Sequence, residues 1–315
     1  MIAYLATRVF RWVTGLLLIL LVAYAMMFYG AGDPIKRMFL DQQQGSIAIE
    51  EEVLEAIRKK YGLDAPFPQQ FTNYLKNLTQ GNLGWSIREK RSVGDMVKVR
   101  LPISIQLGLA ATAMMMVIGI PLGVLAALRH NRWLDQLVVG SFVFVNAVPI
   151  FVTAPLLLWF LVVGLGVMDV PFGWKGIFHP QVILPVFILC LGGLPTVVRQ
   201  TRAAILEVIG EDYIRTARAK GLPGRLVVFR HMLRPILIPV ITSIGLIMIS
   251  LVNGAIFVEL IFNIPGFGNL TVNGLKTVDY PVIMATVFVG ALIVMVSNLM
   301  IDFIYPLLDP RIARR

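Results

Sequence analysis

Long apolar stretches separated by short charged segments dominate the hydrophobic pattern of this chain. A helix needs about 20 mostly apolar residues to cross the hydrocarbon core of a bilayer. Six stretches reach or approach this length: residues 9–29, 103–128, 134–167, 182–198, 236–262 and 281–306. The pattern therefore predicts an all-α integral membrane protein with six transmembrane helices.

The third stretch is too long to form one straight helix. Its 34 residues, 134–167, would give about 50 Å of helix at about 1.5 Å per residue. Pro149 and Pro155 interrupt the stretch, and a proline in a helix interior kinks or breaks the helix. We expect either one kinked, partly protruding helix or two segments.

The distribution of Lys and Arg among the connections favours the first alternative. With one span here, 15 basic residues fall on one side of the membrane, eight of them in residues 199–234. The short loops on the other side carry only Lys175 and Lys276. Because cytoplasmic loops carry the excess of Lys and Arg, the count predicts six spans with both termini cytoplasmic. Two segments would place the basic 199–234 loop outside.

Composition agrees with a membrane protein and excludes other classes. Hydrophobic residues make up 57% and charged residues 15% of the 315 residues, against about 45–50% and about 25% in soluble domains. The mean hydropathy is +0.78, and a single cysteine, Cys190, excludes a disulfide framework. The net charge of +10 would suggest nucleic acid in a soluble chain, but here we expect the lipid bilayer as the partner and no nucleic acid.

The first apolar stretch follows Arg8 and Arg11 and therefore resembles a secretory signal peptide. Its apolar part, residues 12–29, exceeds the usual 7–15 residues of a signal peptide, and no small-x-small cleavage site follows it. We expect this stretch to be retained as the first span.

Residues 33–100 are predicted to form an external cap between spans 1 and 2. Ser46 is a suitable N-cap for one short helix and Gly62 a suitable stop, while Pro66 and Pro68 separate it from a second helix. Such a cap could meet a soluble partner or act as a passive lid, and the residues do not distinguish these roles.

Residues 199–235 are predicted to form a cytoplasmic hairpin of two short helices. A helical pattern covers 201–220, and a second begins at Gly224. Gly221 and Pro223 lie between them, where glycine suits the left-handed position after a helix and proline cannot continue it. The hairpin therefore bends at 221–224.

Small side chains mark one face of this hairpin. Ala217 and Ala219 leave the face low enough for another protein to approach closely. The alternative is a hairpin that packs only against its own helix bundle.

No signature of an enzyme or of a resident cofactor is present. The chain lacks any Gly-Lys pair, and hence a phosphate-binding loop, and it lacks a Gly-x-Ser-x-Gly elbow. His130, His179 and His231 fall in different loops and have no metal-site spacing. We expect no catalytic residue, no metal site and no ATP site in this chain.

Ionisable residues inside membrane spans are functional candidates by default. Glu259 lies near the outer end of span five and Asp302 near the inner end of span six, where we expect both to be half-solvated and structurally paired, with proton or cation transport as the alternative. Asn146, Asn253 and Asn298 could line a pathway or form interhelical hydrogen bonds.

The run from Asp212 to Leu222, DYIRTARAKGL, resembles the coupling-loop (EAA-type) motif of permease subunits in binding-protein-dependent ABC importers, in the form of the dipeptide/oligopeptide/nickel branch. Motifs similar to that branch cover nearly the whole chain: GLDAP at 62–66, GNLGWS at 81–86, PLG at 121–123, VPIF at 148–151, VELIF at 258–262, IPGFG at 264–268, DYP at 279–281 and LDPR at 308–311. The early first span and the large loop after it resemble the B-type permease.

This resemblance implies the type I ABC importer permease fold in a bacterial cell membrane, with the translocation pathway carrying peptides or related small solutes. It implies four kinds of partner: a second homologous permease as a heterodimer, one or two cytoplasmic P-loop ATPase subunits, an extracytoplasmic substrate-binding protein and the bilayer. ATP and magnesium would then be bound by the ATPase subunits and not by this chain.

The resemblance also implies two functional regions. The ATPase-coupling residues are expected to be Tyr213, Arg215, Thr216, Ala217, Arg218, Ala219, Lys220, Gly221 and Leu222. The outer gate, on the side of the binding protein, is expected to include Glu259, Phe262, Pro265, Gly266 and Gly268.

Two other functions compete with this interpretation. A stand-alone secondary transporter or channel would have an acid at mid-membrane and broken segments in matching halves, neither of which we find. A membrane scaffold without transport would tolerate the cytoplasmic hairpin without requiring it.

Overall fold

The structure is a computed structural model that describes residues 2–30, 51–61 and 64–308. Within these ranges it is helical and has no β-strand, only an isolated bridge between Trp85 and Ser92. Contacts divide the chain into two compact units. Unit 1 is Met1–Pro102 with Asn269–Met295, and unit 2 is Ile103–Gly268 with Val296–Arg315.

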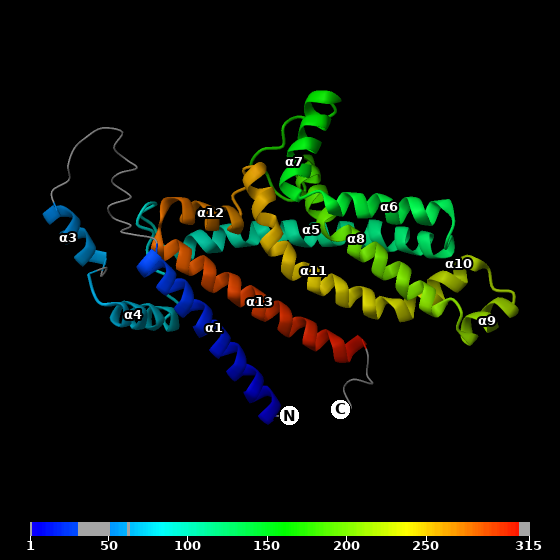
Figure 1. Cartoon of the computed structure of the whole chain (residues 1–315), viewed down its shortest axis with the longest axis horizontal. Coiled ribbons are helices and arrows are strands. Elements are labelled where there is room, and N and C mark those ends of the chain that lie inside the picture. Colours follow the sequence, from blue (N-terminus) through cyan, green and yellow to red (C-terminus); the bar gives the residue numbers. More distant parts are fainter. Residues whose placement is uncertain (1, 31–50, 62–63, 309–315) are drawn as a thin grey trace. The chain divides into compact units, whose positions relative to one another are not determined.

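The helices follow one another along the whole described chain (Figure 1). They are α1 (Ile2–Gly30), α3 (Glu51–Tyr61), α4 (Phe67–Thr79), α5 (Val93–Leu128), α6 (Trp133–Ala147), α7 (Ile150–Leu158), the π-helical segment η1 (Trp159–Gly164), the 3-10 turn η2 (Pro180–Val182), α8 (Ile183–Val208), α9 (Asp212–Ala219), α10 (Gly224–Leu226), the π-helical segment η3 (Val227–Met232), α11 (Leu233–Ile261), α12 (Phe267–Thr277) and α13 (Tyr280–Leu308). Four helices are long and apolar enough to cross a membrane, or up to six if each of two bent pairs is one span. The predicted all-α membrane fold is confirmed.

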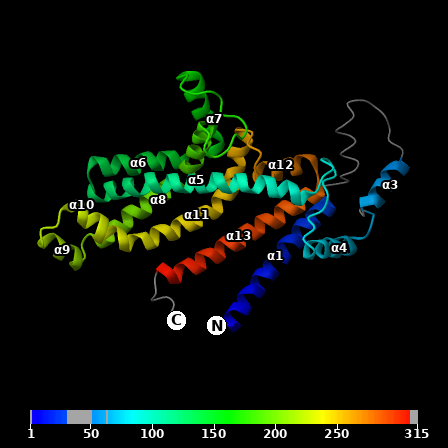
Figure 2. The same ribbon diagram turned by 180° about the vertical axis from the view of Figure 1, so that it is seen from behind.

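The third predicted span is one of these bent pairs. Its two parts, Trp133–Ala147 and Ile150–Gly164, meet at 102°, and Figure 2 shows α7 turning sharply away from α6. Val148 at the end of α6 is extended (φ −96°, ψ 119°), because the ring of the following proline disfavours a helical conformation there. Pro149 is then the N-cap of α7. Pro155, in contrast, lies inside α7.

Close helix contacts at glycine build the core of unit 2 around α8. A Cβ atom at Gly123 of α5 would lie 2.7 Å from the backbone oxygen of Val198 in α8. At Gly193 of α8, a Cβ would lie 2.5 Å from Met115 Sδ and 2.8 Å from Ile247 Cγ2 of α11. Small residues let membrane helices approach in this way. The helices of unit 2 can therefore pack this closely only because Gly123 and Gly193 have no side chain.

The continuous helix predicted over 201–220 is wrong. Helix α8 ends at Val208, and the turn 209–211 precedes α9. Gly210 lies in this turn, where a glycine favours helix termination because it loses the most conformational entropy in a helix. Glu211 is extended (φ −66°, ψ 148°) and precedes the first turn of α9. Of the predicted cytoplasmic hairpin, the first helix is therefore α9 alone, and the second part begins after Gly221.

Unit 1 is built on aromatic packing between α1 and α4. The Tyr24 ring contacts Phe67, Phe71 and Tyr74 with centroids 5.5–5.9 Å apart, and the Tyr24 hydroxyl donates to Gln70 Oε1 at 3.1 Å. The predicted N-cap Ser46 and helix stop Gly62 lie outside the described residues, as does part of the predicted external cap.

A buried carboxylate ties the segment before α5 to the start of α13 within unit 1. Ser86 Oγ donates to Asp279 Oδ2 at 2.5 Å, and the backbone N–H groups of Ile87 and Arg88 donate to the same carboxylate at 3.3 and 3.2 Å. Because three donors hold Asp279, which is 3% exposed, its buried charge is compensated.

Candidate functional site

The strongest candidate site is α9 with the bend that follows it, in unit 2. Asp212 lies in the first turn of α9 and Arg218 in the last, which complements the helix dipole at both ends. Arg215 Nη1 lies 3.5 Å from Asp212 Oδ1, and both side chains are largely exposed. Such an exposed pair adds little to stability, so these charges are free to contact another molecule.

The end of α9 has the geometry of a Schellman motif. Gly221 adopts φ +75°, its N–H donates to the Arg218 oxygen at 2.9 Å, and the Leu222 N–H donates to the Ala217 oxygen at 3.4 Å. These are the two bonds that close a helix when the residue after it is left-handed. The left-handed conformation predicted for Gly221 is confirmed, and it fixes the direction in which the chain leaves α9.

Two residues anchor α9 to the rest of unit 2. Ile214 and Ala217 are 0% and 5% exposed and belong to a buried cluster that also contains Ile205 of α8 and Met232 and Ile236 from the following segment. The prediction that Ala217 leaves a low face for a partner is therefore wrong, because Ala217 faces its own bundle. Ala219, its predicted companion, is exposed.

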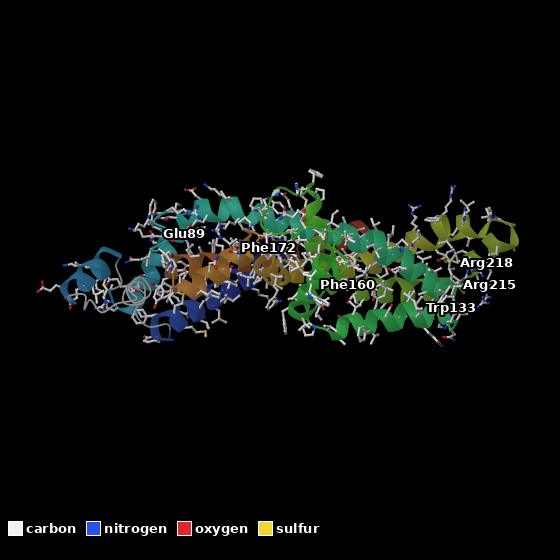
Figure 3. The ribbon with its side chains drawn as sticks, turned by 90° about the horizontal axis from the view of Figure 1, so that it is seen from above. Glu89, Trp133, Phe160, Phe172, Arg215 and Arg218 are labelled. Atoms are coloured by element: carbon white, nitrogen blue, oxygen red, sulfur yellow. The ribbon has the colours of Figure 1, made fainter. Side chains whose placement is uncertain are left out.

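The opposite face of α9 is exposed and mainly basic. Its exposed residues are Asp212, Tyr213, Arg215, Thr216, Arg218, Ala219, Lys220 and Gly221, and Leu222 is half-buried. Three of them are basic and one, Asp212, is acidic. Figure 3 shows Arg215 and Arg218 at one end of unit 2, the end that also carries Trp133. Burial and the nearby Glu211 carboxylate raise the pKa of the Tyr213 phenol above its ordinary value. This face therefore presents positive charge beside a neutral phenol.

An ion pair that the sequence did not reveal supports the helix before α9. Arg202 of α8 donates through Nε to Asp135 Oδ1 at 2.6 Å and through Nη2 to Asp135 Oδ2 at 2.8 Å, and His130 Nδ1 lies 3.0 Å from Arg202 Nη2. The Asn131 N–H also donates to Asp135. The available signal was an acid, Asp135, at the second residue of the predicted third span.

The predicted outer gate forms a compact turn between α11 and α12, also in unit 2. Ser104 Oγ of α5 donates to Glu259 Oε1 at 2.5 Å and accepts from the Phe267 N–H at 2.7 Å. The Ile264 N–H donates to the Glu259 backbone oxygen at 2.8 Å. Through Ser104, the carboxylate therefore holds the start of α12 in place.

Glycine is required where this turn encloses the carboxylate. A Cβ at Gly266 would overlap the Glu259 carboxyl group, and one at Gly268 would lie 2.8 Å from the Ile256 Cα. Glu259 and Phe262 are both 0% exposed, whereas Pro265 is exposed. The expectation of a half-solvated Glu259 is wrong because three segments enclose it, but its expected structural pairing is found, with Ser104.

The predicted pathway residues do not come together in one described site. Asn146 and Asn298 are exposed, while the side chains of Asn253 and Asp302 lie outside the described part. Exposure in the isolated chain is compatible with lining a pathway or with contacting another subunit. Pathway lining therefore stays a prediction for these three asparagines.

Metal ligation finds no support among residues 2–30, 51–61 and 64–308. In these ranges, no three His, Cys, Asp or Glu side chains come close enough to hold a metal ion. The His130 ring instead lies 3.4 Å from the Asp135 carboxylate, within the ion-pair cluster.

Comparison with known proteins gives matches along nearly the whole chain. Residues 119–314 match the family described as "Binding-protein-dependent transport system inner membrane component", and residues 1–108 match the description "Binding-prot-dependent transport system membrane comp, N-term". The chain is 35% identical to the oligopeptide transport system permease protein OppB of Salmonella typhimurium, covering 99% of both chains. It is 36% identical to AppB, a protein of the same description from Bacillus subtilis, again covering 99% of both chains.

A solved structure supports the fold. The inward-facing MetNI methionine ABC transporter matches with a TM-score of 0.58 at 18% identity, covering 68% of this chain and 96% of that chain. At this identity the likeness concerns the arrangement of helices alone.

Proposed function

The chain belongs to the family of inner membrane components of binding-protein-dependent transport systems, and we propose that it forms part of the translocation pathway of an ABC importer for peptides. Family membership identifies a multi-pass membrane transport component and favours it over a stand-alone carrier or channel. The proposed substrate class rests on the names of relatives that are 34–36% identical, which are oligopeptide and dipeptide transport system permeases.

The geometry of α9 carries the proposed mechanism. In our proposal, the basic exposed face of α9 enters a groove on a cytoplasmic ATPase, while Ile214 and Ala217 transmit its displacement to α8 and α11 through the cluster that they share. The ion pair between Arg202 of α8 and Asp135 of α6 holds α8 next to its contact with this cluster. Closure of the ATPase subunits on ATP would then move α9 as a rigid body and change the packing of the spans.

The remaining partners and the orientation follow the same proposal. A second homologous permease completes the pathway, an extracytoplasmic binding protein delivers the peptide, and one or two P-loop ATPases bind ATP and magnesium, so that this chain needs no ATP site or enzymatic activity of its own. Both termini are cytoplasmic in this arrangement, which is supported by the excess of Lys and Arg in the 199–234 segment.

Replacing Gly221 by valine tests the coupling role. Valine is β-branched and disfavours φ +75°, so the exit from α9 should be displaced while the buried anchors Ile214 and Ala217 remain. We expect the Gly221→Val complex to assemble and to show less than about a tenth of the peptide-stimulated ATP hydrolysis, a loss of about 1.4 kcal/mol of coupling, measured in proteoliposomes with binding protein present.

Gly176→Val is the matched control. Gly176 has φ +98° and no neighbouring atom within 4 Å of its Cβ position, so the substitution imposes the same kind of strain in a loop that does not contact α9. Its stimulated hydrolysis should stay near that of the wild type. Normal stimulation in Gly221→Val, or equal losses in both variants, would contradict the coupling role.

A further inference from the structure

Unit 2 contains an apolar groove that is lined, apart from Arg218, by residues to which the proposed transport cycle gives no contact with a partner subunit. Its cavity volume is about 450 Å³, and it lies between the C-terminal half of α5 and the segment formed by α10, η3 and the start of α11. The lining residues are Ile120, Pro121, Val124, Leu125, Leu128, Arg218, Gly224, Arg225, Val227, Val228, Phe229, Met232 and Leu233. Only two of these residues are charged.

Three large apolar side chains that line this groove are exposed. Phe229 is 71% exposed, Leu128 43% and Leu125 38%. Exposed apolar side chains that are grouped around a concave surface indicate a binding site for an apolar group. The groove extends along α5, which is long and apolar enough to cross the membrane, so the natural apolar occupant is an acyl chain of the surrounding lipid.

The charges at the groove have one sign. Arg218 and Arg225 belong to its lining, and no acidic residue is found among the lining residues that the structure describes. Neither arginine has an ion-pair partner within the described part of the chain. Guanidinium groups form bidentate hydrogen bonds with phosphate, and basic pockets between membrane helices bind anionic lipid headgroups.

We propose that this groove binds an anionic phospholipid, with part of one acyl chain between α5 and η3 and the phosphate against Arg225 and Arg218. A protein segment is disfavoured as occupant because it would have to bring both acidic and apolar groups, which one phospholipid supplies together. The lipid would belong to the cytoplasmic leaflet, a detail that rests on the proposed orientation. Arg218, in the last turn of α9, would then be shared by the lipid site and the face proposed to contact the ATPase.

Native mass spectrometry of the intact purified transporter tests this proposal. The delipidated complex is titrated with phosphatidylglycerol and separately with phosphatidylcholine, and bound lipids are counted. We expect a saturable phosphatidylglycerol site that Arg225→Gln weakens about fivefold, since a basic residue near the headgroup contributes about 1 kcal/mol. Leu128→Trp, a substitution of an exposed lining residue, should fill the groove and reduce binding of the same lipid.

Arg230→Gln is the control of equal charge change, because Arg230 is exposed on η3 and is absent from the groove lining. Equal affinity for the two lipids, or equal losses in Arg225→Gln and Arg230→Gln, would overturn the proposal. The proposal would also be overturned if a protein segment occupied the groove. Cys190 is buried and is the only cysteine, so Phe229→Cys places a single accessible thiol in the groove, and its crosslinking to another subunit would show such an occupant.

This test does not depend on transport. Lipid counting needs neither peptide nor ATP hydrolysis, so a complex in which Gly221→Val leaves coupling intact would contradict the proposed function without affecting the lipid site. A complex that couples normally but shows no preference for phosphatidylglycerol would overturn the lipid site alone.

Discussion

Helix α9 with the bend at Gly221 and the turn between α11 and α12 are both short segments of unit 2 that depend on glycine, and the sequence predicts a functional contact for each. Their environments are opposite. In α9, Ile214 and Ala217 are buried and most other side chains are exposed. In the turn, Glu259, Phe262 and Gly266 are buried and Pro265 is exposed.

The difference separates a surface built for contact from a segment built for packing. The exposed charged side chains of α9 make few ion pairs within the described part of the chain. Substitutions there should therefore alter contacts with other molecules and leave the fold intact. The Glu259 carboxylate is held by Ser104 and enclosed by glycines, so substitutions there should first destabilise the chain. The outer-gate role predicted for this turn is therefore tested by whether stability and transport can be separated.

The largest loss of stability is expected from Glu259→Ala. Removal of the carboxylate leaves the Ser104 hydroxyl without its acceptor and opens a cavity beside Gly266. A buried donor left without its acceptor costs about 1–3 kcal/mol, and the cavity adds about 2 kcal/mol or more. We expect a large decrease in the thermal unfolding temperature of the detergent-purified protein, measured by differential scanning fluorimetry.

Glu207→Ala is the control for this change, because Glu207 is an exposed acid on α8. It should leave the unfolding temperature nearly unchanged. A stable Glu259→Ala protein that has lost transport would contradict the packing role and restore the predicted gate.

A smaller loss is expected from Asp135→Asn. The substitution removes the charge that pairs with Arg202, whose side chain is one-quarter exposed, so solvent reduces the cost to about 2–3 kcal/mol. The unfolding temperature should decrease by less than in Glu259→Ala. Asp169→Asn, an exposed acid of the loop after η1, is the matched substitution, and an equal decrease in both proteins would show that the ion pair does not stabilise unit 2.

Arg215→Ala should change stability least and yet strongly reduce the affinity for the ATPase subunits. Its side chain is 74% exposed, and surface substitutions change stability by about 0.5 kcal/mol or less. Contact residues at interface hot spots contribute more than about 1–2 kcal/mol, so affinity for the ATPase subunits should fall about tenfold in a pull-down titration. Lys175→Ala is the control, and equal affinities would contradict the contact role of α9.

Local signals in the sequence predicted the elements that depend on neighbouring residues. The Gly221–Pro223 pair predicted the end of α9 correctly, because helix termination there is decided by three successive residues. Pro149 predicted an interruption in the third span but not the 102° bend, because the angle depends on how the two helices pack.

Long-range contacts explain what the sequence did not predict. Glu259 is separated from Ser104 by 155 residues, and its position near a span end suggested solvent that the packed turn excludes. Similarly, the pattern over 201–220 remained helical through Gly210, whereas the chain turns there and Ile214 and Ala217 join a cluster with Met232 and Ile236. For the pair of Asp135 and Arg202, 67 residues apart, the sequence signalled one member, an acid at the start of a span, but not its partner.

Site-specific crosslinking from α9 tests the central claim most directly. Because Cys190 is buried, Arg215→Cys introduces the single accessible thiol, and Phe178→Cys introduces one at a residue that is 98% exposed in the loop before η2. In native membranes treated with a short thiol–amine crosslinker, we predict a product with a P-loop ATPase, identified by mass spectrometry, from position 215 and none from position 178. No ATPase product from position 215, or the same product from both positions, would contradict the account.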